Sequence, residues 1–335
     1  MNIGLLGTGT WGIALARMLC LNGNDVTCWS ALPEEIEQLR TQRKHKNLPG
    51  VVIPQEIRFT ENIKEACENK EIVVFAVPSV YVRSTAAAAA PFIADGQLIV
   101  DVAKGIEPDT LLTMTGVIED VLEKHGNRHD LKLVALSGPT HAEEVSRDIP
   151  TAIVAASRDK AAAETVQNVF TNDCMRVYTH HDVLGVELCG AVKNVMALAA
   201  GISAGLGFGD NTKAALITRG MAEIARLGLK MGCDVHTFAG LAGIGDLIVT
   251  ATSVHSRNNR CGQLIGSGMT PDEAVKQVGM VVEGINALPA TMKLSRVYGV
   301  EMPIAEAVNN VVFQGSDPRE MVMNLMKREK RAEND

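Results

Sequence analysis

The sequence is poor in aromatic residues and carries no excess of positive charge. Its 335 residues include 2 Trp, 3 Tyr and 7 Phe, and its formal net charge is −7. Proteins that bind nucleic acids present a basic surface and usually stack aromatic side chains on bases, so this composition argues against that class. The hydrophobic fraction of 46% is too high for a disordered chain. We therefore expect a folded protein without a nucleic-acid partner.

Patterned cysteines, a basic leader and a long uncharged run are also missing. The seven cysteines include no Cys-x-x-Cys pair, and no histidines have metal-ligand spacing, which argues against a disulfide framework and against a metal site. The first charged residue is Arg17, so the start lacks the basic segment of a signal peptide. The longest later uncharged run, 194–209, is shorter than the ~18 residues of a membrane span. We expect a cytoplasmic protein without stable membrane insertion.

The first half of the chain alternates short apolar runs with helical patterns. Strands are expected at Asn2–Leu6, Val26–Trp29, Glu71–Val77, Gln97–Val102, Leu131–Leu136, Thr151–Ala156 and Met175–Tyr178, with helices such as Trp11–Leu21, Pro33–Gln42 and Thr110–Lys124 between most of them. This alternation predicts βαβ units and a parallel sheet with helices on both faces.

The second half has a helical pattern throughout. Helices are expected at Asp182–Ile202, Lys213–Met231, Thr270–Val278, Gly284–Tyr298, Ile304–Phe313 and Pro318–Arg328, with Asp182 as an N-cap. At roughly 100–200 residues per domain, the length predicts two domains. We place an α/β dinucleotide-binding domain at 1–182 and an all-α substrate and catalytic domain at 183–335.

A glycine motif lies between the first expected strand and the first expected helix. It reads Gly7-Thr8-Gly9-Thr10-Trp11-Gly12. In a Rossmann-like βαβ unit, the first glycine allows a tight turn, the second lets a pyrophosphate approach the backbone, and the third lets helix and strand pack closely. The helix N-terminus then offers N–H groups to the phosphates. The context favours dinucleotide binding over a plain glycine-rich turn.

The end of the second expected strand bears on the choice between NAD and NADP. NAD-specific sites place an acidic residue there, about 20 residues after the glycines. This sequence has Ser30-Ala31-Leu32, and its first acids, Glu34 and Glu35, fall inside the next expected helix. Without a carboxylate, a 2′-phosphate is not repelled, but no arginine is present to select it. Our hypothesis is use of NADP, with NAD also possible.

Lys193 is the one charged residue between Glu187 and Asp210. A helix this apolar is buried all round, and burial lowers the pKa of a lysine so that it exchanges protons near neutral pH. Gly190, Ala197 and Gly201 recur on its face and leave room for a ligand or another backbone. A lysine in a structural ion pair or with its ammonium at the surface is the alternative interpretation.

A polar segment, 243–260, contains Asp246 and the run Ser256-Arg257-Asn258. Arginine, serine and asparagine donors suit a phosphate, and Asp246 is placed to pair with Lys193, although such a loop is more often a solvated turn. In the first domain, Lys104 and the Gly138 turn each follow an expected strand. Because ligands bind beyond strand carboxyl ends in such sheets, both should line the dinucleotide crevice, unless Lys104 is a plain surface lysine.

Several ordered segments together resemble the bacterial type of NAD(P)-dependent glycerol-3-phosphate dehydrogenase. The resemblance runs from Gly4 to about Phe313 and rests on GTGTWG, AKGIEPDTLL, LSGPTHAEEV, GVELCGAVKNVMALAAGI, NTKAALITRGMAEIARLG, GLAGIGDLIVTATSVHSRN and GMVVEGI. It implies hydride transfer between NAD(P)(H) and sn-glycerol 3-phosphate or dihydroxyacetone phosphate, a role in phospholipid synthesis, and a homodimer.

The resemblance also implies roles for individual residues. The catalytic residues would be Lys193, Lys104, Asn194 and Asp246, with Lys193 as the proton acceptor. The phosphorylated substrate would contact Lys104, Gly138, Thr140, Lys193, Asp246, Ser256, Arg257 and Asn258. The cofactor would contact Gly7, Gly9, Thr10, Trp11, Gly12, Lys104, Ala142, Arg257, Val281 and Glu283. Thr10 replaces the usual serine, and Ser30-Ala31 lacks the usual histidine or arginine.

Two other functions fit part of the pattern. A related two-domain hydroxy-acid dehydrogenase would share lysine-based proton transfer, but the TSVHSRN segment suits a phosphate better than a carboxylate. A non-catalytic dinucleotide-binding regulator would bind the cofactor without turnover, but it would have no need for Lys104, Lys193, Asp246 and Arg257.

Overall fold

The structure is a computed structural model that describes residues 1–126, 130–330 and 332–333. The chain forms two compact units: Met1–Gly190 with His236–Asp246, and Ala191–Val235 with Leu247–Asp335. These units differ from the expected division at 182/183, because Val186 and Ala242 join a cluster with Ala135, Val154 and Ala156 of the sheet. The start of the long helix and a segment near 240 therefore belong to the first unit.

The first unit contains an eight-stranded sheet in the order β3-β2-β1-β4-β5-β6-β7-β8. Its strands are β1 (Asn2–Leu6), β2 (Asp25–Trp29), β3 (Arg58–Thr60), β4 (Ile72–Phe75), β5 (Leu98–Asp101), β6 (Lys132–Ser137), β7 (Thr151–Ala156) and β8 (Met175–His180). Seven of them confirm the expected strands, and the three-residue edge strand β3 was not expected.

The expectation of a parallel sheet is correct for every neighbouring pair except β6 and β7, which are antiparallel. The connection between these two strands carries only the one-turn helix α6 (Ala142–Val145). A parallel return needs a crossover of a dozen or more residues, usually a helix. No such helix is present there, so β7 runs in the opposite direction.

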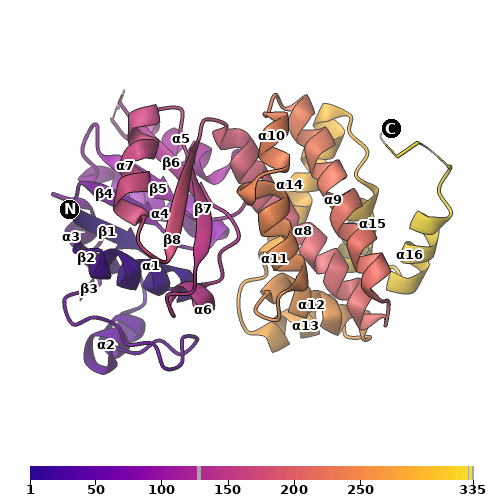
Figure 1. The fold of residues 1–335 in the computed structure, drawn as a ribbon, viewed down its shortest axis with the longest axis horizontal. Coiled ribbons are helices and arrows are strands. Elements are labelled where there is room, and N and C mark those ends of the chain that lie inside the picture. The colour runs from indigo at the N-terminus through magenta and orange to yellow at the C-terminus, as the bar shows by residue number, and fades with distance from the viewer. Residues whose placement is uncertain (127–129, 331, 334–335) are drawn as a thin grey trace. The chain divides into compact units, whose positions relative to one another are not determined.

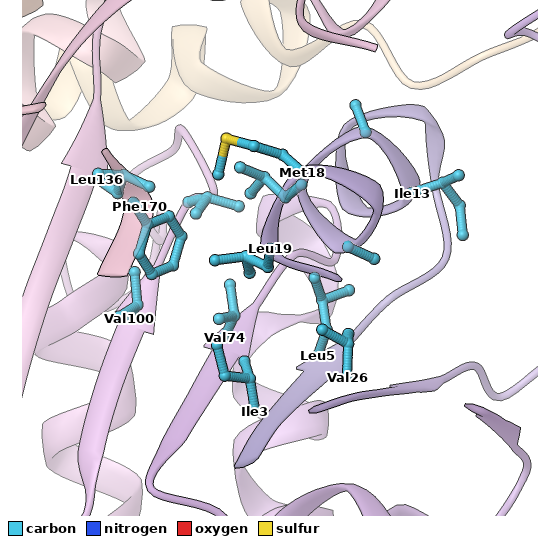
Figure 2. Packing of buried hydrophobic residues seen from close by; sticks show 14 of the residues in the cluster. Ile3, Leu5, Ile13, Met18, Leu19, Val26, Val74, Val100, Leu136 and Phe170 are labelled. Atoms are coloured by element: carbon cyan, nitrogen blue, oxygen red, sulfur yellow. The ribbon is translucent and has the colours of Figure 1, made fainter. Parts of the chain in front are cut away.

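Helices cover both faces of the sheet, as expected (Figure 1). They are α1 (Thr10–Leu21), α2 (Pro33–Gln42), α3 (Ile63–Cys67), η1 (Ser79–Tyr81), α4 (Val82–Ala89), η2 (Ala90–Phe92), α5 (Met114–Gly126), α6 and α7 (Lys160–Phe170). On one face, Met18 and Leu19 of α1 lie over Ile3, Leu5 and Val74 of the sheet (Figure 2). On the other face, the buried alanines Ala86, Ala89 and Ala90 of α4 and η2 belong to a hydrophobic cluster with residues of the sheet.

Helix α5 begins four residues later than the expected start at Thr110. Leu111 has a positive φ of 61°, and Thr113 pairs with Ile106 in an isolated antiparallel bridge. These two features keep residues 110–113 out of the helix and leave Thr113 beside its first turn.

The second unit is helical, as expected. Its elements include most of α8 (Val183–Gly205), α9 (Asp210–Lys230), α11 (Asp246–Thr252), α12 (Arg257–Gly266), α13 (Pro271–Val278), α14 (Glu283–Tyr298), α15 (Pro303–Gln314) and α16 (Pro318–Met326). Helix α10 (Val235–Phe238) and the π-helical turn η3 (Leu241–Gly245) precede α11 and lie almost wholly in the first unit. The Asp182 side chain accepts a hydrogen bond from the backbone N–H of Gly185, which confirms the expected N-cap of α8. By length and composition alone, Val183–Gly205 and Val235–Thr252 could each cross a membrane, but 89% of the first window is buried inside the protein.

Candidate active site

The glycine motif has the geometry that its sequence predicts. Gly7 has a φ of +118°, and a Cβ there would lie 2.6 Å from the carbonyl oxygen of Ala76 on the neighbouring strand connection. A Cβ at Gly9 would meet nothing within 4 Å, whereas one at Gly12 would lie 2.2 Å from the oxygen of Gly7. No side chain caps the N-terminus of α1. The loop therefore turns tightly, packs its helix closely and leaves open space at Gly9, where a phosphate would approach.

Lys104 lies just beyond β5 and makes an ion pair within the first unit. Its Nζ donates to Oδ2 of Asp246 at 2.6 Å and to the carbonyl oxygen of Gly138 at 3.1 Å. Thr140 donates to the same carbonyl at 3.1 Å, and Gly138 has a φ of +153°. The Asp246 side chain is only 1% exposed. Lys104, Gly138 and Thr140 therefore meet at the carboxyl ends of β5 and β6, as expected, and Asp246 joins them.

Two buried carboxyl groups near Lys104 were not expected from the sequence. Asp101 ends β5, and Glu187 of α8 accepts hydrogen bonds from the side chains of Thr113 and Thr115 and from the Thr115 N–H. Burial raises the pKa of Asp101 well above its usual value, and the charge of Glu187 raises it further. Burial also raises the pKa of Glu187, although the threonine hydrogen bonds oppose the shift. Both carboxyl groups are therefore harder to ionise than a solvent-exposed carboxyl group.

Gly190 of α8 lies against the side chains of Ser137 and Lys104. A Cβ at Gly190 would lie 3.1 Å from Ser137 Oγ and 3.5 Å from Cγ of Lys104. The absence of a side chain at Gly190 leaves space for the aliphatic part of Lys104. Of the three small residues expected to leave room on the face of Lys193, Gly190 therefore makes room for a side chain of the first unit.

Lys193 lies on α8, as expected, and is 4% exposed. Its Nζ donates to Thr250 Oγ1 of α11 at 2.5 Å within the second unit. Thr250 was not predicted as a site residue, although it lies in the polar segment 243–260, because its spacing did not link it to Lys193. The expected pair between Lys193 and Asp246 stays a prediction.

Residues 246–260 form two helices joined by a short exposed turn near Val254, so the expectation of a solvated loop is correct only for that turn. Asp246 begins α11, and Ser256 caps α12 by accepting a hydrogen bond from the Asn259 N–H at 3.2 Å. Ser256 and Asn258 are buried, whereas Arg257 is exposed in the first turn. A helix N-terminus with an exposed arginine suits an anion. The N-cap serine was the available sequence signal for α12.

Asn258 connects three helices of the second unit. It donates to Asn194 Oδ1 of α8 at 2.9 Å and accepts from the N–H of Gly284 in α14 at 2.8 Å. Glu283, the first residue of α14, accepts a hydrogen bond from the side chain of Asn286 at 3.5 Å. The network places Asn194 and Asn258 together, and the catalytic role of Asn194 and the substrate contact of Asn258 stay predictions.

Helices α8 and α12 meet through glycines. A Cβ at Gly201 would lie 2.1 Å from the oxygen of Asn259, and one at Gly262 would lie 2.2 Å from the oxygen of Leu198. Gly205 and Gly266 are in equally close contact with the opposite backbone. Gly201 thus leaves room for another backbone, one of the two options that the sequence left open.

Two expected cofactor residues remain. Ala142 begins α6 in the first unit, and Val281 lies two residues before α14 in the second. Neither makes a contact that assigns it a role, and their cofactor contacts stay predictions. Among the residues that the structure describes, no three His, Cys, Asp or Glu side chains gather as metal ligands would.

The strand order, the glycine loop and the helical second unit define a dinucleotide-binding dehydrogenase fold. More specifically, the chain belongs to the NAD-dependent glycerol-3-phosphate dehydrogenase family, whose N-terminal model matches residues 2–163 and whose C-terminal model matches residues 182–323.

Full-length relatives agree with this assignment. The chain is 64% identical to "Glycerol-3-phosphate dehydrogenase [NAD(P)+] 2" of Lactobacillus delbrueckii subsp. bulgaricus over 332 residues, which are 99% of this chain and 98% of the relative. It is 47% identical to the Bacillus subtilis glycerol-3-phosphate dehydrogenase [NAD(P)+] over 98% of this chain and 95% of the relative. The crystal structure of the Coxiella burnetii glycerol-3-phosphate dehydrogenase has a TM-score of 0.92 at 32% identity, covering 98% and 99% of the two chains.

A more distant neighbour bears on the hydroxy-acid alternative. A D-mandelate dehydrogenase structure has a TM-score of 0.64 at 14% identity and covers 96% of this chain and 99% of its own. This likeness shows a shared fold alone.

Proposed function

We propose that this chain interconverts dihydroxyacetone phosphate and sn-glycerol 3-phosphate with NAD(P)(H). The observation that carries the proposal is that both lysines singled out by the sequence are held by specific partners, Lys104 by Asp246 and Lys193 by Thr250. Membership of the family over both halves of the chain supports the same reaction. A loss of NADPH or NADH absorbance on addition of dihydroxyacetone phosphate tests it directly.

The residues of the first unit fit a dinucleotide. The open space at Gly9 and the uncapped N-terminus of α1, which begins with Thr10 and Trp11, suit a pyrophosphate. When bound, the nicotinamide supplies the hydride in reduction and takes it up in oxidation. The chain itself has to orient the substrate, move one proton and stabilise charge on the reacting oxygen.

The two lysines divide this work. In reduction, the ammonium of Lys193 gives a proton to the substrate oxygen, and in oxidation neutral Lys193 takes up the hydroxyl proton. Thr250 accepts a hydrogen bond from Lys193 Nζ and so fixes the direction of the amine. The role of Lys104, which is paired with Asp246, is to stabilise negative charge on the reacting oxygen.

The proton-transfer role is tested by Lys193→Met. General acid–base catalysis contributes about 10²–10⁴-fold, so kcat should fall by that factor while the thermal unfolding curve stays cooperative. Lys276→Met, at an exposed position on α13, is the matched control and should leave kcat unchanged. Near-normal turnover of the Lys193 variant would remove it from the mechanism.

The first turn of α12 binds the substrate phosphate in this proposal. Arg257 provides the charged fork, while Ser256 and Asn258 are already fixed by hydrogen bonds of their own. Charge-assisted hydrogen bonds contribute about 1.5–3 kcal/mol, so Arg257→Ala should raise KM for dihydroxyacetone phosphate by about 10–100-fold. Arg260→Ala, one turn later and also exposed, is the control. An unchanged KM would exclude Arg257 from the site.

A substrate panel distinguishes the alternatives. Turnover of unphosphorylated hydroxy acids at a rate comparable to that of sn-glycerol 3-phosphate would favour the hydroxy-acid dehydrogenase. Tight NADPH binding without turnover of any panel member would favour the regulator.

We further propose that the protein works as a cytoplasmic homodimer, apart from nucleic acids and membranes, and supplies sn-glycerol 3-phosphate for phospholipid synthesis. A groove of about 900 Å³ in the second unit, flanked by exposed Leu229 and Met326, supports a self-association surface. Light scattering after size exclusion should give twice the chain mass, and Leu229→Glu should reduce it. A wild-type mass of 35.8 kDa would contradict the dimer.

A further inference from the structure

A carboxylate reaches the end of β2 from the helix that follows it. Glu35 lies in the first turn of α2, and its Oε2 accepts hydrogen bonds from Ser30 Oγ at 2.9 Å and from Thr8 Oγ1 at 2.5 Å. Ser30 directly follows β2, and Thr8 lies between the first two glycines of the motif. The two hydroxyl-bearing residues are 6% and 1% exposed, so the Glu35 carboxylate is fixed to buried parts of the fold.

The position of this carboxylate changes the interpretation of the cofactor slot. Sites for NAD place an acidic side chain at the end of the second strand, where it accepts hydrogen bonds from the adenosine ribose hydroxyls. The sequence has no acid there, but the side chain of Glu35 is hydrogen-bonded to both the strand end and the glycine loop. Its Oε1 receives no hydrogen bond from any residue that the structure describes, and the residue is half-buried. One carboxylate oxygen therefore remains to accept a ribose hydroxyl.

We propose that Glu35 binds the adenosine ribose hydroxyls and makes this chain prefer NAD(H) to NADP(H). The inference rests on the proposed function, because it concerns the cofactor of that reaction. A 2′-phosphate carries a charge of about −1.5 to −2 at neutral pH, and next to a carboxylate it is repelled. Because two hydroxyl groups hold Glu35, the side chain does not turn away without losing both hydrogen bonds.

The basic residues of the adjoining loop do not offset this repulsion equally. The Arg43 guanidinium is engaged by the carbonyl oxygens of Pro54 and Ile57 and lies 5.1 Å from the centre of the Phe59 ring. Lys46 is exposed, and its charge acts on His45, whose ring N–H also donates a hydrogen bond to the backbone of Thr8. Lys44 is exposed in the same loop, so Lys44 and Lys46 are the two competing cations that the test must address.

The test measures cofactor binding, so its outcome does not depend on turnover. NADH and NADPH are titrated by their fluorescence into the wild-type protein, Glu35→Gln and the control Glu34→Gln, which changes an exposed acid of the same turn. The wild type should bind NADH at least tenfold more tightly than NADPH. Glu35→Gln should shift the ratio of the two Kd values toward NADPH by at least tenfold, and Glu34→Gln should leave it unchanged.

A second variant covers a failure of Glu35→Gln to fold. Glu35→Asp keeps the charge but shortens the side chain, so NADH should weaken while NADPH stays disfavoured. Equal or tighter NADPH binding by the wild type, or the same Kd ratio in Glu35→Gln, would overturn the inference. If the wild type prefers NADPH and either Lys44→Met or Lys46→Met weakens NADPH binding, that lysine holds a 2′-phosphate and the inference is wrong.

Failure of this inference is distinguishable from failure of the proposed function. A protein that reduces dihydroxyacetone phosphate equally well with either cofactor overturns the role of Glu35 alone. A protein that has the expected Kd ratio but does not turn over dihydroxyacetone phosphate overturns the proposed function and supports the role of Glu35.

Discussion

The glycine contact between α8 and α12 gives a quantitative prediction for Gly262→Ala. The added Cβ would lie 2.2 Å from the carbonyl oxygen of Leu198, 2.8 Å from the N–H nitrogen of Ile202 and 2.9 Å from Cα of Gly201. All three are backbone atoms of one helix, so no side-chain rotation relieves the clash. The two helices must separate by about 1 Å to restore ordinary van der Waals distances.

The expected loss of stability follows from two opposing contributions. Overpacking a close-packed interface costs about 1–3 kcal/mol, and the purely backbone contacts place Gly262→Ala at the upper end of that range. Alanine is favoured over glycine inside a helix by about 1 kcal/mol. The net loss is therefore about 2 kcal/mol, which at about 2–4 °C per kcal/mol corresponds to a Tm lower by about 4–8 °C.

The same separation should also affect substrate binding. Asn258 in the first turn of α12 is hydrogen-bonded to Asn194 of α8 at 2.9 Å, and a shift of about 1 Å breaks good geometry for that bond. We expect a higher KM for dihydroxyacetone phosphate in Gly262→Ala, measured beside calorimetry.

The control is Gly116→Ala in α5, where the nearest atoms to the new Cβ lie 3.5 Å away, so it should match or exceed wild-type stability. If Gly262→Ala is as stable as Gly116→Ala, the helices adapt without cost and the reasoning is wrong.

Three buried carboxyl groups give further predictions. Burial raises the pKa of Glu223 to about 7. The protonated side chain therefore stabilises the fold fully below the ordinary pKa of 4.5, and this stabilisation is lost as the pH rises through 7. The free energy of unfolding, measured with urea, should fall by about 3 kcal/mol over that range. Glu223→Gln should flatten that slope, and an unchanged slope would contradict it. Burial likewise raises the pKa of Asp101, so Asp101→Asn should gain stability over the wild type as the pH rises above 3.8; a loss there would show that the charged form is needed. Lys104→Met should destabilise the fold by about 3 kcal/mol through the buried charge of Asp246, and adding Asp246→Asn should restore stability without restoring kcat.

The parts of the fold that the sequence predicted are those in which one local pattern decides the structure. The strands Asn2–Leu6 and Thr151–Ala156 and the helix Pro33–Gln42 have the predicted bounds, because an apolar run or an N-terminal proline defines each. Gly7 and Gly12 were predictable for the same reason, since the turn and the close packing depend only on neighbours in the βαβ unit.

The expectations that differ from the structure share a cause: at those positions, residues distant in the chain decide the structure. The bridge between Ile106 and Thr113 delays α5, and the packing of Ala242 on the sheet moves residues 236–246 into the first unit. The distance in sequence from Ser30 to Glu35 is short, but only the fold shows that the carboxylate turns back to Thr8. Residue spacing predicts an acid only at the strand end itself, so it does not predict one that the next helix supplies.

Helix α8 shows why composition alone misleads. Its length and hydropathy fit a membrane span, yet three of its glycines have a defined neighbour: Gly190 faces Lys104 in the first unit, and Gly201 and Gly205 face the backbone of α12 in the second. Small residues let a helix be enclosed closely, and close enclosure is what leaves Lys193 4% exposed. In the proposed function, the apolar character of α8 supports proton transfer by Lys193, because the closely packed residues around the amine exclude water. Replacing its glycines with larger residues should consequently impair the reaction even at positions that never touch the substrate.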